Sequence, residues 1–70
     1  MIRQSVSSGN ICSIGYDSES QTLEIEFRSG DIYQYFKVPE SIYNALMSAS
    51  SHGSFFHHHI KERYQWRKIR

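Results

Sequence analysis

The chain has little cysteine, little proline and no long hydrophobic run. Because Cys12 is the only cysteine, no disulfide can form within the chain, which argues against a small secreted scaffold held by disulfides. No stretch of about 18 apolar residues occurs, so no transmembrane helix is predicted. The first residues also lack the apolar segment of a signal peptide. We therefore expect a cytoplasmic protein that does not bind a membrane.

Aromatic residues, in contrast, are numerous: five tyrosines, four phenylalanines and one tryptophan. A domain this short buries only about 60% of the surface that its unfolded chain exposes. Each aromatic side chain can bury ~150–250 Å², so these residues can supply much of a small core. We expect one domain over residues 1–70.

Positive charge gathers near the C-terminus. Residues 1–60 carry three basic and six acidic side chains, a net charge of −3, whereas residues 61–70 carry five basic and one acidic, a net charge of +4. Such asymmetry indicates an anionic partner. The alternative is a solvated C-terminal segment that serves only solubility.

The N-terminal part of the chain is predicted to hold a loop and one strand. Residues 3–10 are small and polar and are interpreted as an entry loop anchored by Val6. The apolar, β-branched run over residues 11–16 predicts the first strand. Residues 17–21, rich in Asp, Ser and Glu, predict a turn.

The second strand is the clearest element. Leu23, Ile25 and Phe27 alternate with polar residues, which predicts a strand with one apolar and one polar face. Glu24 and Glu26 lie together on the polar face, and we interpret them as a solvated strand surface rather than as a catalytic pair.

The turn at Ser29 and Gly30 decides which face two tyrosines of the third strand, predicted over residues 32–38, will take. A type I turn with Gly30 in a left-handed bulge position is favoured, because a two-residue type I′ turn would require positive φ at Ser29. The bulged register places Tyr33 and Tyr35 on the apolar face, partly buried with their hydroxyls at the rim. The tighter turn would place both tyrosines outside, beside the glutamates.

The favoured register puts Ile32 and Phe36 on the opposite face of the sheet. That face then needs a cover of its own or stays exposed and apolar. An exposed patch of this kind would dock another protein or a second copy of the chain.

A helix is predicted directly after the sheet. Pro39 cannot continue a ladder but suits the first turn of a helix. The stripe Ile42, Ala45, Leu46 and Ala49 has helical spacing and predicts the face that packs on the core.

A second short helix is predicted over residues 54–62, with Ser54 as its N-cap and Phe56 and Ile60 on one face. The following segment, residues 63–67, alternates basic or polar residues with aromatic ones, and we expect it to add a strand to the sheet. The predicted fold is α+β: a three-stranded antiparallel meander, two short helices on one face and a C-terminal edge strand.

No motif predicts an enzyme. The histidines His57, His58 and His59 point about 100° apart on a helix, whereas a closed zinc site needs four converging ligands. We expect one histidine among these three and the nearby His52 to pack between helix and sheet and the others to face water. Cys12 lies in an apolar run, where cysteine is usually a buried and unreactive residue. No catalytic residue, metal or cofactor is predicted.

Aromatic and basic residues alternate along the third strand and the tail. Single-stranded nucleic acid binds to such surfaces, because bases stack on rings while Lys and Arg neutralise phosphates. The alternative is that most of these rings are core. The candidate binding residues are Tyr33, Tyr35, Lys37, Lys61, Arg63, Trp66, Arg67 and Lys68.

The order of short motifs along the chain resembles the KTSC domain. These motifs are Ser7-Ser8-Gly9-Asn10-Ile11, Ile14-Gly15-Tyr16-Asp17, Leu23-Glu24-Ile25-Glu26-Phe27, Ser29-Gly30, Tyr33-Gln34-Tyr35, Val38-Pro39 and Ser51-His52-Gly53-Ser54-Phe55-Phe56. The family is named for its place at the C-terminus of some lysyl-tRNA synthetases and also occurs as small proteins of bacteria and their viruses. The resemblance marks Tyr33 and Tyr35 as hallmark positions without assigning them a role, and the family's attachment to a tRNA synthetase implies RNA binding. The alternative function is a protein-interaction or self-associating module.

Overall fold

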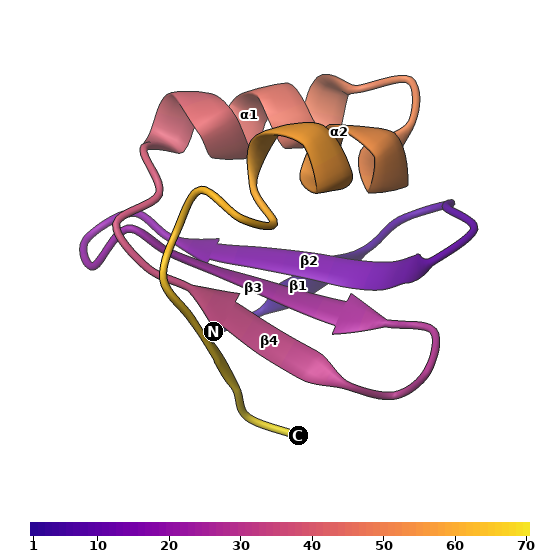
Figure 1. The fold of residues 1–70 in the computed structure, drawn as a ribbon, viewed down its shortest axis with the longest axis horizontal. Helices are drawn as coiled ribbons and strands as arrows, with labels where there is room; N and C mark the ends of the chain where they lie inside the picture. The colour runs from indigo at the N-terminus through magenta and orange to yellow at the C-terminus, as the bar shows by residue number, and fades with distance from the viewer.

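Two helices cover one face of a five-stranded antiparallel sheet (Figure 1). The computed structural model describes residues 1–70. The strands lie in the sheet in the order in which they occur in the chain. The elements are β1 (Arg3–Ser5), β2 (Ile11–Asp17), β3 (Thr22–Phe27), β4 (Ile32–Tyr35), α1 (Glu40–Ser48), α2 (His52–His59) and β5 (Trp66–Lys68). The α+β class, an antiparallel meander followed by two helices, and a C-terminal edge strand are confirmed, but the meander has four strands instead of three and the last strand covers Trp66–Lys68 instead of residues 63–67.

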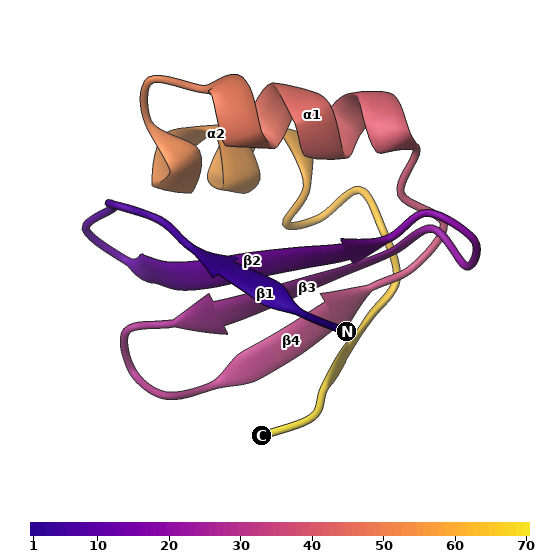
Figure 2. The same cartoon turned by 180° about the vertical axis from the view of Figure 1, so that it is seen from behind.

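The predicted entry loop is wrong for Arg3–Ser5, which form the edge strand β1 (Figure 2). Arg3 pairs with Gly15 of β2, and Ser5 pairs with Ser13. This short strand carries no apolar alternation, so its sequence gives no strand pattern. Its position depends on the backbone ladder with β2 and on the side chain of Arg3, which reaches past β2 to β3.

The β3–β4 hairpin has the predicted bulged register. Gly30 has φ +98°, and the Phe27 amide donates to the Asp31 carbonyl over 2.9 Å. Ile25 therefore pairs with Tyr33. The tyrosines of β4 lie on the face of the sheet that the helices cover, which we call the inner face, and the tighter turn is ruled out.

Strand β4 ends at Tyr35, three residues before its predicted end at position 38. Lys37 adopts a left-handed conformation with φ +58°, which turns the chain away from the sheet. The Val38 amide then donates to the Gln21 carbonyl over 2.9 Å. This contact buries Val38 completely and directs the chain into α1.

Helix α1 begins directly after Pro39, as predicted. Leu46 is its only buried residue, and Ile42 packs against the core with part of its surface exposed. Ala45 is exposed, so the predicted apolar stripe is too wide there. Neither helix of the protein has the length and apolar character that crossing a lipid bilayer requires.

Helix α2 begins at His52, two residues earlier than predicted, and its N-cap is Ser51. The Ser51 hydroxyl accepts a hydrogen bond from the Ser54 amide over 3.2 Å, so Ser54 is part of the helix and not its cap. The predicted packing face is correct, because Phe56 and Ile60 are both buried.

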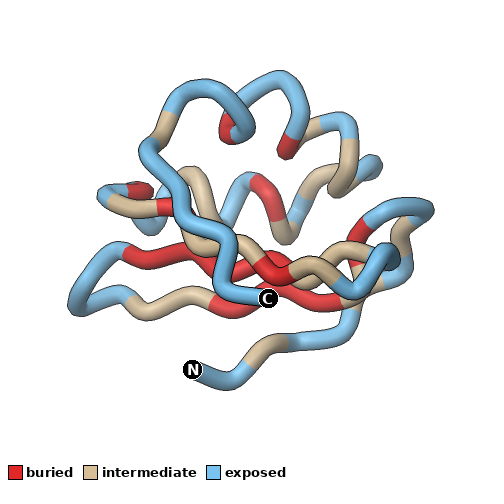
Figure 3. The backbone as a smooth tube through the Cα atoms, turned by 60° about the horizontal axis from the view of Figure 1, so that its bottom comes forward, coloured by how far each residue is buried: buried red, intermediate tan, exposed pale blue.

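The core lies between the inner face and the helices. Figure 3 shows buried segments along the strands, whereas the C-terminal tail is exposed almost throughout. Nine buried residues form the core cluster: Ile11, Ile14, Leu23, Ile25, Tyr35, Val38, Leu46, Phe56 and Ile60.

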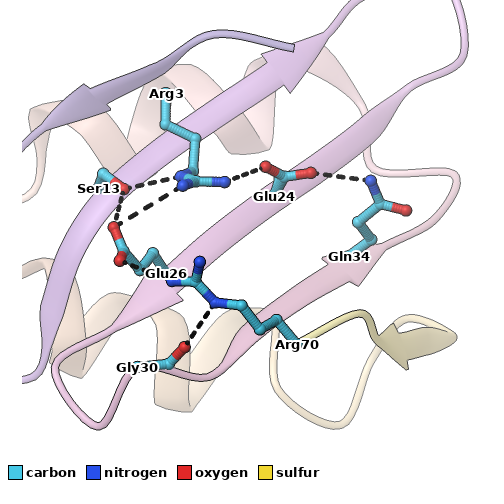
Figure 4. Close-up of polar contacts among 7 residues, drawn as sticks. All are labelled: Arg3, Ser13, Glu24, Glu26, Gly30, Gln34 and Arg70. Atoms are coloured by element: carbon cyan, nitrogen blue, oxygen red, sulfur yellow. Dashed lines mark hydrogen bonds and ion pairs between the residues drawn. The ribbon is translucent and has the colours of Figure 1, made fainter.

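The opposite, outer face of the sheet carries a network of charged side chains (Figure 4). The prediction of a solvated glutamate surface is wrong for Glu24, which is only 6% exposed. The guanidinium group of Arg3 forms an ion pair with it, and Gln34 donates from Nε2 to its Oε1 over 2.8 Å. Both carboxylate oxygens therefore have a partner, as a buried charge requires.

The second glutamate of β3 is held by both ends of the chain. Glu26 Oε1 accepts from the Ser13 hydroxyl over 2.8 Å, and Ser13 in turn accepts from Arg3 Nε over 2.9 Å. Arg70 lies 3.4 Å from Glu26 Oε2 and donates from Nε to the Gly30 carbonyl. Residues near the two termini thus meet on the central strand.

The apolar pair expected on the outer face is largely covered. Ile32 is only 5% exposed, and Phe36 is partly buried. The backbone after β5 lies alongside, since the Ile32 amide donates to the Arg70 carbonyl over 2.9 Å and the Ile69 amide donates to the Ile32 carbonyl over 2.8 Å.

Gly15 gives β1 the room to lie against β2. A Cβ at this position would lie 2.9 Å from the Ile2 carbonyl oxygen and 3.0 Å from Arg3 Cγ. We expect Gly15→Ala to lower the free energy of unfolding by about 1–2 kcal/mol, because the backbone of β1 must shift. Thermal unfolding followed by circular dichroism measures this. Gly9→Ala is the control, since a Cβ there meets nothing within 4 Å, and equal stability of the two variants would contradict the explanation.

Candidate functional site

A groove opens between α2 and the inner face of the sheet, at the side formed by β4 and β5. Its volume is about 730 Å³. The strands contribute an aromatic wall made of Phe27, Tyr33, Tyr35 and Trp66. Helix α2 and the segment after it contribute Gly53, Phe56, His57, Lys61, Glu62 and Tyr64, and loops contribute Asn10, Arg28, Ser29 and Asp31. We call this site the aromatic groove.

The rings of the aromatic groove form one continuous cluster. The ring centroid of Tyr33 lies 5.7 Å from Phe27, 6.4 Å from Tyr35 and 5.4 Å from Trp66. Phe56 of α2 packs edge-on against Tyr35 at 5.4 Å. Contacts of this geometry fix the orientation of each ring, so the wall is formed in the absence of a ligand.

The register of β5 explains why Trp66 joins this cluster. Trp66 pairs with Tyr35, and Lys68 pairs with Tyr33, so both tail residues lie on the inner face. Arg67 pairs with Gln34 and therefore lies on the outer face. The alternation of the strand thus divides the tail between the two faces of the sheet.

Exposure changes along the aromatic wall. Tyr35 is 4% exposed and Trp66 is 55% exposed, while Tyr33 between them is partly buried. The wall therefore leads from the core to solvent, with Tyr35 at its inner end and Trp66 at its outer end. The prediction of partly buried tyrosines is correct for Tyr33, whereas Tyr35 is buried.

Tyr16 and Tyr35 differ in what their hydroxyls contact. The Tyr16 hydroxyl donates to the Val38 carbonyl. The Tyr35 hydroxyl forms no hydrogen bond within the protein, although every fully inaccessible polar side-chain atom has a partner. The hydroxyl therefore keeps some access to solvent, and Tyr35 lines the aromatic groove. Burial, and to a lesser extent Tyr33, raises the pKa of Tyr35 to about 12, so this phenol is neutral at pH 7.

Two basic residues, Arg28 and Lys61, and two acidic residues, Asp31 and Glu62, line the aromatic groove. Lys61 is exposed and forms no ion pair. The Arg28 guanidinium is held by the carbonyls of Ser8 at 2.7 Å and Gly9 at 2.9 Å. Lys68 lies 3.5 Å from Asp31, and this ion pair reduces the charge that Lys68 offers to a ligand.

The structure brings together only part of the predicted binding set. Tyr33, Tyr35, Lys61 and Trp66 line the aromatic groove. Lys68 lies on the same face of the sheet, at its edge. Three predicted residues do not line the groove and are exposed elsewhere: Lys37 in the left-handed turn after β4, Arg63 in the turn after α2, and Arg67 on the outer face.

Sequence reasoning missed two aromatic residues as part of the site, Phe27 and Phe56. Phe27 and Phe56 are expected in the core, and both do pack against it. Phe27 is nevertheless only partly buried. Phe27 is the last residue of β3 and lies beyond the last residue paired with β4. This position at the end of the strand could have predicted that its ring lies at the edge of the core.

The histidines do not form a metal site. No group of three His, Cys, Asp or Glu side chains lies close enough to hold an ion. His57, His58 and His59 all face solvent, as expected for all but one of the four histidines. Only His52 is partly buried, and its Nδ1 lies 2.9 Å from the Leu46 carbonyl oxygen.

Cys12 is also placed differently from expectation. It lies at an irregularity of β2, where the register with β3 shifts between Ile11 and Ser13. The extra residue is only partly buried, whereas Ile11 beside it is fully buried. Cys12 lies outside the aromatic groove.

Comparison with known proteins gives a consistent result over nearly the whole chain. The sequence model of the KTSC domain family matches residues 7–64. The crystal structure of a KTSC domain protein from Yersinia pestis superposes with a TM-score of 0.96 at 49% identity, covering 99% of this chain and 97% of that one.

Curated relatives fall into two groups. An uncharacterised protein of Stutzerimonas stutzeri is 41% identical over 69 residues, which are 96% of this chain and 97% of that protein. A lysine–tRNA ligase of Trichormus variabilis is 43% identical over 54 residues, which are 77% of this chain but only 10% of the ligase. The chain thus spans about a tenth of the length of the ligases that it matches.

Proposed function

The chain belongs to the KTSC domain family, and we propose that it binds single-stranded RNA in the aromatic groove. In this proposal Trp66 stacks on a base and Lys61 neutralises a neighbouring phosphate. The protein acts as a binding module and carries out no chemical step.

One observation carries the proposal: an exposed tryptophan ring continues an ordered aromatic wall beside an unpaired lysine. Trp66 is 55% exposed and touches Tyr33 edge-on at 5.4 Å, while Lys61 lines the same groove. Stacking of a base on such a ring contributes about 1–3 kcal/mol.

The relatives support the choice of RNA over other anions. The ligase of Trichormus variabilis is named for an RNA substrate, and a region 43% identical to this chain forms a tenth of it. An RNA-binding module is a consistent addition to such an enzyme. For this chain the same role is a proposal that rests on the aromatic groove.

Binding can be measured through Trp66 itself, because it is the only tryptophan. We expect short single-stranded RNA to change its fluorescence at low salt, and we expect the affinity to fall as salt rises, since bound phosphates release counterions. Absence of binding at low salt, or binding that salt does not weaken, would reject the proposal.

A charge variant on each face of the sheet locates the RNA. Lys61→Ala removes a charge at the groove, and we expect it to weaken binding and to reduce the salt slope by about 0.7, the value for one phosphate contact with a single strand. Arg67→Ala removes the same charge from the outer face and should leave the slope unchanged. If Arg67→Ala reduces the salt slope and Lys61→Ala does not, RNA binds on the outer face instead.

A further inference from the structure

The inner end of the aromatic groove holds a tyrosine whose hydroxyl has no hydrogen-bond partner within the protein. Tyr35 is only 4% exposed, it lines the groove, and its hydroxyl forms no hydrogen bond with the protein. Since every fully inaccessible polar side-chain atom has a partner, this hydroxyl keeps some access to solvent and is free to bond to a ligand. Fixed by Tyr33 and Phe56 on its two sides, the ring holds this hydroxyl at the base of the groove.

The outer end of the groove offers room for stacking on one ring only. Trp66 is the single aromatic residue among the exposed large apolar side chains. Proteins that bind a continuous strand use several exposed rings along a track of several nucleotides. The volume of about 730 Å³ falls instead within the range of pockets for one small molecule, ~300–1,000 Å³.

We infer that the aromatic groove takes one unstacked nucleobase, whose polar edge forms a hydrogen bond with the Tyr35 hydroxyl while Trp66 contacts its ring. This inference rests on the proposed function and narrows it from RNA in general to a single-nucleotide site. The base is the preferred occupant because it is flat enough for an aromatic wall and carries hydrogen-bonding groups at its edge. Lys61 at the rim is available for the phosphate of the same nucleotide.

The neutral state of Tyr35 determines which groups it can recognise. At pH 7 the phenol carries its proton and can both donate and accept one hydrogen bond. It can therefore contact a carbonyl oxygen, a ring nitrogen or an exocyclic amino group. A site with such a hydroxyl discriminates among bases by their edges, whereas stacking alone tolerates every base.

The test uses the four ribonucleoside 5′-monophosphates and Tyr35→Phe in the full chain. We expect at least one monophosphate to displace single-stranded RNA, and Trp66 fluorescence measures this displacement. The four monophosphates should differ in their affinity for the protein. Tyr35→Phe should weaken the binding of the preferred monophosphate about three- to tenfold, the effect of one lost hydrogen bond. It should leave the salt slope for RNA unchanged, because no phosphate contact is lost.

Stability provides the control for folding. Tyr35→Phe removes a hydroxyl without a protein partner, so its melting temperature should equal or exceed that of the wild-type protein. Tyr16→Phe removes a hydroxyl that donates to Val38 and should lower the melting temperature while leaving nucleotide binding intact.

Each outcome separates the inference from the proposed function. If RNA binds with salt dependence but no monophosphate competes, or if Tyr35→Phe keeps the base preference, the single-base site is wrong and RNA binding stands. If neither RNA nor monophosphates bind at low salt, both are wrong.

Discussion

Leu46→Ala should lower the free energy of unfolding by about 3 kcal/mol, within the range for buried leucines. Leu46 is the only buried residue of α1 and is completely inaccessible to solvent, so its loss leaves a cavity between the helix and the sheet. A domain of 70 residues has a total stability of roughly 4–10 kcal/mol. The variant should therefore lose about a third or more of it.

Thermal unfolding by circular dichroism measures this change. For a domain of this size, each kcal/mol shifts the melting temperature by about 4–8 °C, so we expect a fall of about 12–24 °C. Asn44→Ala is the control within the same helix, because Asn44 is exposed and alanine favours helix. A fall of less than about 4 °C for Leu46→Ala would mean that α1 is not held by this side chain.

Trp66→Ala should weaken the binding of single-stranded RNA by about 1–3 kcal/mol, which corresponds to roughly 5- to 150-fold. The loss follows from removing the exposed ring at which the base stacks. Because the variant has no tryptophan, binding is followed by the fluorescence anisotropy of labelled RNA. Trp66→Phe keeps an aromatic face and should retain most of the affinity.

Ile69→Ala is the matched truncation for this experiment. Ile69 is 42% exposed and belongs to the same tail, but it does not line the aromatic groove. We expect RNA affinity close to that of the wild-type protein. If Trp66→Ala and Ile69→Ala weaken binding equally, the tail acts through its general position and not through the stacking ring.

Local chemistry made part of the fold predictable. Ser29 and Gly30 specify a turn in which only glycine takes positive φ, and this alone fixes the register of β3 and β4 and the face that Tyr33 and Tyr35 occupy. The alternation around Trp66 likewise predicts a strand. The same alternation also implies that Arg67 and Trp66 lie on opposite faces of the sheet. The prediction of a single binding surface along the tail did not take this into account.

Other features depend on contacts between distant residues and are not visible in a local pattern. Strand β1 is polar and is held by Arg3, whose partner Glu24 is distant in sequence. Gly15 matters only because β1 passes over it. The prediction places the start of α2 two residues too late, because it assigns Ser54 as the N-cap, whereas Ser51 caps the helix and His52 contacts the Leu46 carbonyl.

The candidate site was predictable in its chemistry but not in its shape. Aromatic rings and Lys61 were expected to form one surface, and the groove does contain them. The burial of Tyr35 under Phe56 requires the position of α2, which follows from the whole core. The left-handed turn at Lys37 removed that residue from the strand, and no neighbouring glycine signalled it.

The ion pairs of Arg3 with Glu24 and of Arg70 with Glu26 have a consequence for tethering. Both chain ends emerge on the side of the sheet away from the helices (Figures 1 and 2). A second protein fused to either end would lie on the outer face of the sheet and would leave the aromatic groove between α2 and β5 open. The domain can thus be attached through either end without a change in the orientation of the aromatic groove.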